Sequence, residues 1–150
     1  MSHMKAFHRA FLVSAGVILL ITGIAKMWSG FGSARILAVA DPLLGLQFGH
    51  LIFVAGALEL VVANVCLFSK SSQAATILVA WLATNLLAYR LSFWLMGWHR
   101  QCSCLGNLTD ALHIPPQTAD TAMKIILAYL LIGSYGILFH LWWRKKENAE

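Results

Sequence analysis

The sequence predicts an all-α integral membrane protein, a single domain built as a bundle of four transmembrane helices. Of its 150 residues, 59% are hydrophobic and only 11% are charged, whereas soluble domains are about 45–50% apolar and about 25% charged. The mean hydropathy is +0.72. Because so few polar side chains cannot cover a surface in water, much of this chain must have membrane lipid as its solvent.

Four apolar stretches are each long enough to cross a bilayer, which takes about 20 helical residues. They lie at about residues 10–28, 48–68, 74–98 and 122–143. Backbone polar groups in hydrocarbon must be bonded within the chain, and the alternation typical of barrel strands is absent. Each stretch is therefore predicted to be a helix.

The tryptophans support these boundaries, because indole rings favour the level of the lipid headgroups. Only Trp81 lies in mid-span, and we expect it to pack within the bundle. The others fall at predicted helix ends: Trp28, Trp94, Trp98, Trp142 and Trp143.

Small and polar residues inside the spans predict contacts between helices. We expect the side chains of Thr22, Asn64 and Asn85 to form interhelical hydrogen bonds. Glycines allow backbones to approach closely, and the ones at positions 16, 23 and 56 are predicted to do so.

The distribution of Lys and Arg predicts an orientation. The loops of one side hold Arg35 and Arg100, and the other side is richer in basic residues: Lys5, Arg9, Lys70, Arg144, Lys145 and Lys146. Basic residues favour the cytoplasmic side, so both termini and the short turn at 69–73 are predicted there. The long connection at 99–121 then faces outward, which is the periplasmic face of a bacterial inner membrane. Although the pI is about 9.4, no basic stripe marks a polar face, which argues against nucleic-acid binding.

The strongest chemical feature is a Cys-x-Cys pair, Cys102 and Cys104, in that long connection. A disulfide between them closes a tight ring, and strain favours thiol–disulfide exchange over permanence. Structural bridges usually close longer loops, and Arg100 nearby favours the reactive thiolate. Redox exchange is thus the leading interpretation, and a bridge that only shapes the loop is the alternative. Cys66 stands alone in an apolar run and is expected to fill space.

Metal binding is a third interpretation of the same loop, in which the two thiolates and a histidine would hold Zn²⁺ or Cu⁺. His99 and His113 flank the cysteine pair, but zinc sites favour two to four residues between paired cysteines. The sequence contains no flavin or haem motif. A membrane quinone is one electron acceptor that a dithiol pair at a membrane could use.

Lys26, Glu59 and Arg90 are charged residues inside the predicted spans, and Lys124 lies at the edge of the fourth. Charges at such depth are costly and usually face the bundle interior in pairs, so we expect Glu59 to pair with Lys26 or Arg90. The pair either fixes the order of the helices or takes part in proton or quinone chemistry. After Pro115-Pro116, Thr118 or Asp120 is predicted to cap the fourth helix.

These residues together resemble a known family. Gly23-x-x-Lys26, a central Glu59 and Cys102-Ser103-Cys104-Leu105-Gly106 are similar to the DoxX-like/MauE group of four-helix bacterial membrane proteins, although Leu105 stands where an aromatic residue is commoner. The resemblance implies a periplasmic thiol pair that exchanges electrons with a partner protein or helps its disulfides to mature. For MauE-like members it implies the maturation of methylamine dehydrogenase.

The leading hypothesis is thus a membrane thiol–disulfide redox protein in which Cys102 and Cys104 act on a periplasmic redox or client protein. Lys26, Glu59 and Arg90 would order the helices beneath them. A second hypothesis is a non-catalytic accessory subunit of a membrane complex, with the cysteine pair as a clasp. A proton-coupled transporter that depends on Glu59 is a third.

Overall fold

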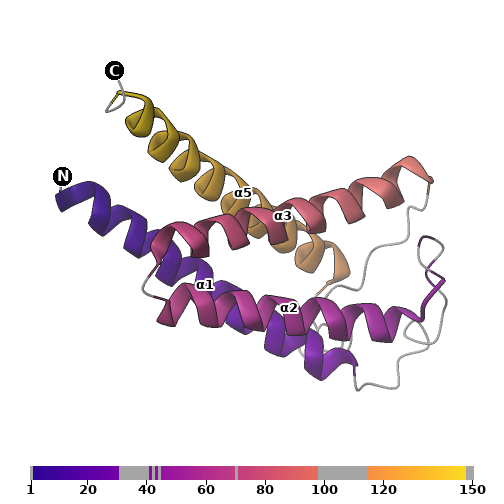
Figure 1. The fold of residues 1–150 in the computed structure, drawn as a ribbon. Helices are drawn as coiled ribbons and strands as arrows, with labels where there is room; N and C mark the ends of the chain where they lie inside the picture. The colour runs from indigo at the N-terminus through magenta and orange to yellow at the C-terminus, as the bar shows by residue number, and fades with distance from the viewer. Residues whose placement is uncertain are drawn as a thin grey trace.

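A computed structural model describes residues 2–30, 41, 43, 45–69, 71–97 and 115–147. It contains four helices: α1 (Ser2–Gly30), α2 (Phe48–Phe68), α3 (Ser72–Leu95) and α5 (Pro116–Glu147) (Figure 1). Each is long and apolar enough to cross a membrane, and the described ranges contain no strand. The all-α, four-helix prediction is confirmed, and by length and composition the chain is a multi-pass membrane protein.

The helices form two antiparallel hairpins, α1 with α2 and α3 with α5 (Figure 1). Both chain termini and the turn from Ser69 to Ser71 lie at one end of the bundle, which we call the terminal end. The opposite end, the loop end, is where α1 and α3 finish and where α2 and α5 begin.

The outer ends of two helices differ from the prediction. α1 begins at Ser2 rather than near residue 10, and α5 runs from Pro116 to Glu147 rather than from 122 to 143. Apolarity marks the part of a helix that lies in lipid, whereas backbone hydrogen bonding continues into water. α2 begins and ends where predicted, and α3 occupies Ser72–Leu95 instead of 74–98.

The predicted cap of the last helix is wrong. Proline suits the first helical position, where its missing N–H needs no partner, and α5 begins at Pro116. The carbonyl of Pro115 accepts hydrogen bonds from the backbone N–H groups of Thr118 and Ala119. Thr118 and Asp120 therefore lie within the helix, and Asp120 is free to bond elsewhere.

Among the described residues, the buried core combines leucines with six alanines, and glycines let the helices pack closely. Gly23 and Gly56 face each other across the α1–α2 interface. A Cβ atom on either would come 3.0 Å from the carbonyl oxygen of the other. At Gly16 a Cβ would come 2.9 Å from Leu67, so the predicted close packing at all three glycines is confirmed.

The predicted interhelical hydrogen bonds are wrong. The side chains of Thr22, Asn64 and Asn85 each donate to a backbone carbonyl in their own helix, three or four residues earlier. A short polar side chain finds such an acceptor locally, without a partner helix. Trp81 is also misassigned, because its side chain is 51% exposed and therefore lies on the outer surface.

Other side chains make the polar contacts between helices. Nε2 of His8 on α1 lies 2.7 Å from Oγ1 of Thr76 on α3. Two tyrosine hydroxyls of α5 also reach across: Tyr129 lies 2.6 Å from Oγ of Ser14, and Tyr135 lies 2.8 Å from Oγ1 of Thr84. The first two contacts join the hairpins toward the terminal end.

Candidate functional site

The predicted site residues divide between two parts of the chain. Cys102 and Cys104 lie outside the described residues, whereas Lys26, Glu59 and Arg90 lie on α1, α2 and α3. Cys66 is described and buried, as expected of a space-filling residue. Within the described ranges, no three His, Cys, Asp or Glu side chains gather closely enough to hold a metal ion.

A buried ion pair joins α1 to α2. The ammonium of Lys26 donates to Oε1 of Glu59, and the two residues are only 5% and 1% exposed. Helical side chains lean toward the N-terminus of their helix, so Lys26, one turn before α1 ends, extends back into the bundle. It meets Glu59 in the middle of α2. This confirms the predicted pairing and selects Lys26 from the two expected partners.

The pair is incompletely bonded. The second carboxylate oxygen of Glu59, Oε2, is buried and accepts no hydrogen bond from the described residues. A buried acceptor without a donor costs about 1–3 kcal/mol. The local packing brings the pair together, because Cβ of Lys26 lies against Gly56, where a Cβ atom would be only 3.1 Å away.

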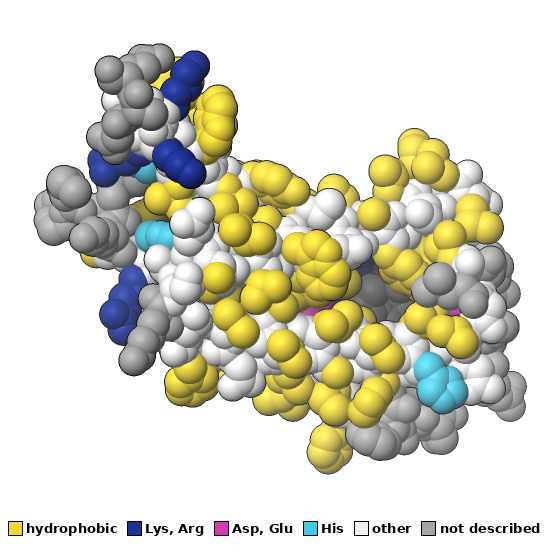
Figure 2. Space-filling model, viewed as in Figure 1, with side chains coloured by type: hydrophobic (Ala, Val, Ile, Leu, Met, Phe, Trp, Pro, Cys, Tyr) yellow, Lys and Arg dark blue, Asp and Glu magenta, His cyan; other side chains and the backbone are white. Residues whose placement is uncertain are grey.

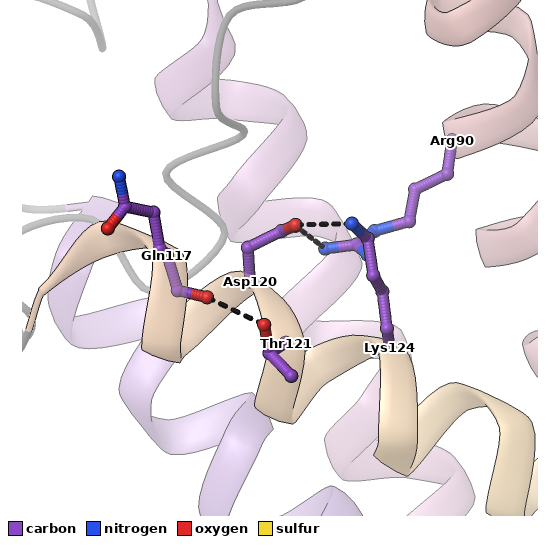
Figure 3. Close-up of polar contacts among 5 residues, drawn as sticks. All are labelled: Arg90, Gln117, Asp120, Thr121 and Lys124. Carbon is purple, nitrogen blue, oxygen red and sulfur yellow. Dashed lines mark hydrogen bonds and ion pairs between the residues drawn. The ribbon is translucent and has the colours of Figure 1, made fainter.

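Arg90 belongs to a second cluster, which ties α3 to α5. Its guanidinium lies 2.9 Å from Oδ1 of Asp120, and the ammonium of Lys124 lies 2.7 Å from Oδ2 (Figure 3). Asp120 and Lys124 are four residues apart on α5 and so share a face. The three side chains together carry one net positive charge, and Arg90 pairs with Asp120 rather than with Glu59.

A third polar cluster was not predicted at all. Asp41 is 1% exposed, and its carboxylate accepts from the hydroxyl of Tyr89 on α3 and from the backbone N–H of Leu43. The backbone N–H of Gly45, which has a φ of +67°, donates to the carbonyl of Asp41. This turn fastens the chain ahead of α2 onto α3. Asp-Pro favours a turn, but nothing in the sequence indicates its partner on α3.

Aromatic rings extend the Asp41–Tyr89 contact. The ring of Tyr89 meets Phe93 edge to face with centroids 4.9 Å apart, and Phe93 lies 6.1 Å from Phe48 on α2. The loop end therefore links the two hairpins through one carboxylate and three rings. On α3, Tyr89 contacts Asp41 in the connection before α2, and the adjacent Arg90 contacts Asp120 in the first turns of α5.

The charge pattern distinguishes the two ends of the bundle. Lys and Arg side chains gather at the terminal end, while hydrophobic side chains cover the sides of the helices (Figure 2). The exposed basic residues there include Arg144, Lys145 and Lys146. At the loop end, each described Lys or Arg is in an ion pair with a carboxylate, and Arg90 and Lys124 share the single carboxylate of Asp120.

No protein-family model, curated protein or solved structure matches this chain. The site is therefore interpreted from its own chemistry. Within the described residues, the loop end has ion pairs that join α1 to α2 and α3 to α5, and a tyrosine–carboxylate hydrogen bond that joins the connection before α2 to α3. Groups of this kind fix a scaffold, and the only nucleophiles predicted for it are the two cysteines of the connection from α3 to α5.

Proposed function

We propose that the chain is a thiol–disulfide exchange protein of the bacterial inner membrane, of the DoxX-like/MauE kind. Cys102 and Cys104 are the exchanging pair, and the loop end faces the periplasm. The observation that carries the proposal is the Cys-x-Cys sequence itself, because a tight disulfide ring is a reactive one.

Covalent geometry supports this placement of the pair. Cys102 follows Gly97, the last described residue after α3, by five positions, so its Cα lies within about 18 Å of that residue. α3 has 24 residues and is about 36 Å long. The pair is thus tethered to the loop-end side of the bundle, away from the termini. The greater density of unpaired basic residues at the terminal end supports a periplasmic loop end.

The proposed reaction is a two-step exchange. A thiolate of the partner attacks one sulfur of the Cys102–Cys104 disulfide, and the other cysteine leaves as a thiolate. The partner's second thiolate then attacks the mixed disulfide. The partner loses two electrons and gains a disulfide, while Cys102 and Cys104 are reduced to the dithiol. A membrane quinone, which accepts two electrons and two protons, is the class of oxidant that would restore the pair.

Lys26, Glu59 and Arg90 are assigned a supporting role. Each already forms an ion pair within the bundle, so each orders helices beneath the thiol pair. The partner is a periplasmic redox or client protein, and a MauE-type function would make methylamine dehydrogenase that client.

The second candidate is a non-catalytic accessory subunit in which Cys102 and Cys104 form a permanent clasp. The observation that favours it is the engagement of the described ionisable groups at the loop end in contacts that fasten one element to another. Such a subunit would stabilise a larger membrane complex without changing oxidation state.

Trapping thiols in growing cells separates the two candidates. Cells carrying a Cys66→Ser background are quenched with acid, and thiols are alkylated with a reagent that shifts mobility on a gel. Exchange predicts oxidised and reduced forms that interconvert when an oxidant or reductant is added, and a Cys104→Ser variant that captures a partner in a mixed disulfide. A single unchanging form and no captured partner would refute the exchange function and favour the clasp.

A further inference from the structure

The ion pair between α1 and α2 has hydrogen-bonding capacity that the described residues leave unused. Oε2 of Glu59 is buried and has no donor among them. The ammonium of Lys26 carries three N–H donors, of which one is seen to bond, to Oε1 of Glu59. Oε2 of Glu59 thus lies beside an ammonium with further N–H groups to donate, in the middle of a span where bulk water is excluded.

A partner for Oε2 must donate a hydrogen bond, and one that also accepts can use a further N–H of Lys26. A buried charge that loses its counter-ion is costly, so a partner for Oε2 must leave the ion pair of Glu59 with Lys26, which is 5% exposed, in place. A metal cation would add a second positive charge beside the ammonium. A neutral molecule with one O–H to give and one lone pair to receive leaves the pair ionised and its net charge at zero.

We propose that one water molecule is enclosed between Glu59 and Lys26, donating to Oε2 and accepting from Nζ. Buried waters in proteins occupy such positions, with about three hydrogen bonds each to groups that otherwise lack partners. Thr22 lies one turn before Lys26 on the same face of α1 and is 8% exposed. Its hydroxyl donates to the carbonyl of Leu19, so its oxygen retains lone pairs for a third contact.

The experiment uses the full chain in lipid nanodiscs, with ¹⁵N at the lysine side-chain nitrogens. Ammonium groups in contact with bulk water exchange too fast to be seen, whereas an enclosed ammonium gives a resolved signal. We expect one slowly exchanging ammonium, assigned to Lys26, with a dipolar cross-peak at the water frequency. Dipolar contact and chemical exchange give cross-peaks of opposite sign in the rotating frame, so the two are distinguishable.

Two variants control the assignment. Lys26→Met is expected to remove the signal, and Lys124→Met, which changes a lysine whose side chain is 66% exposed, is expected to keep it. If Lys26→Met does not fold, correlations through the bonds of the side chain assign the signal in the unaltered protein. A resolved Lys26 signal without a water contact would overturn the proposal. So would a signal lost to rapid exchange, because it would mean an open aqueous crevice rather than one enclosed molecule.

Discussion

At the scale of single residues, charge inside the spans is balanced by specific partners. Lys26 and Glu59 are almost fully enclosed, so neither can exchange its partner for solvent when the other is removed. Removing one member of a buried ion pair typically lowers the free energy of unfolding by about 3–5 kcal/mol, while replacing both by apolar groups often leaves it nearly unchanged. The pair therefore contributes to the pairing of α1 with α2 more than to net stability.

The first prediction concerns this asymmetry. We expect Glu59→Leu and Lys26→Met each to lower the free energy of unfolding by about 3 kcal/mol, because each leaves one buried charge alone. The double variant should lose much less than the sum. Unfolding in mixed micelles, followed by the circular dichroism of the helices, measures all four proteins. Strictly additive losses would contradict the direct coupling of the two residues.

A second prediction concerns the contact of Asp41 with Tyr89. Tyr89→Phe deletes the hydroxyl that donates to a carboxylate 1% exposed, and we expect a loss of about 1–3 kcal/mol in the free energy of unfolding. Tyr135→Phe is the matched control, because it removes a hydroxyl contact with Thr84 from a residue 51% exposed. That change should cost about 0.6 kcal/mol. Equal losses would mean that the buried contact with Asp41 stabilises the fold no more than the exposed contact with Thr84.

Sequence reasoning predicted a partner for Glu59 but offered both Lys26 and Arg90. The choice depends on how each helix is rotated about its axis, and α2 is apolar on all sides, so no periodic pattern fixes that rotation. Asp120 was missed as the partner of Arg90 because the preceding prolines made it a candidate helix cap. Its spacing to Lys124, four residues on, was the signal that could have placed it within the helix.

At the scale of elements, α1 and α2 pack through glycine. An added Cβ on Gly56 would stand 3.0 Å from the carbonyl oxygen of Gly23 and 3.1 Å from Cβ of Lys26. Backbone atoms cannot move aside as the end of a flexible side chain can, so the two helices would have to separate. Small residues at such a position allow the close approach that stabilises helix pairs in membranes.

The third prediction follows from that contact. We expect Gly56→Ala to lower the free energy of unfolding by about 1–3 kcal/mol, and Gly136→Ala to leave it unchanged or slightly higher. Gly136 is the control because an added Cβ there meets nothing within 4 Å, and alanine is the better helix former. Unfolding of both variants in the same micelles makes the comparison. A loss at position 136 equal to that at 56 would locate the effect in the glycine backbone rather than in the interface.

The elements also differ in how well the sequence predicted them. The centres of all four helices follow from apolar length, because lipid leaves the backbone no alternative to internal bonding. The outer ends of α1 and α5 do not, since most of the residues that extend them are polar and gain nothing from lipid. The interhelical bonds of Asn64 and Asn85 were also mispredicted. Both side chains donate to carbonyls of their own helix, because a nearby acceptor costs less to reach than one on another helix.

At the scale of the whole molecule, the bundle is two hairpins fastened at both ends. Toward the terminal end, His8 and Ser14 contact the second hairpin, and a Cβ on Gly133 of α5 would overlap the ring of Phe11. At the loop end, Asp41 and Phe48 reach Tyr89 and Phe93. Because the described residues contain four candidate spans, we expect both termini on one side of the membrane and both long connections on the other.

The last prediction tests that arrangement and its orientation. Ser71 and Gln117 are exposed and lie at opposite ends of the bundle, so single cysteines are placed there in a chain whose three native cysteines are replaced by serine. In intact spheroplasts, a membrane-impermeant maleimide should label position 117 at once and position 71 only after permeabilisation. The unexposed native site, Cys66 restored alone, should resist labelling under both conditions.

Each outcome bears on a different part of the molecule. Labelling of both positions from the same side would mean that α3, the one described helix between them, does not cross the membrane, and would contradict the four-span arrangement. The reverse order, with position 71 labelled first, would preserve the bundle but place the Cys102–Cys104 segment in the reducing cytosol. Disulfides do not persist there, so the thiol–disulfide exchange function requires the orientation that the unpaired basic residues of the terminal end favour.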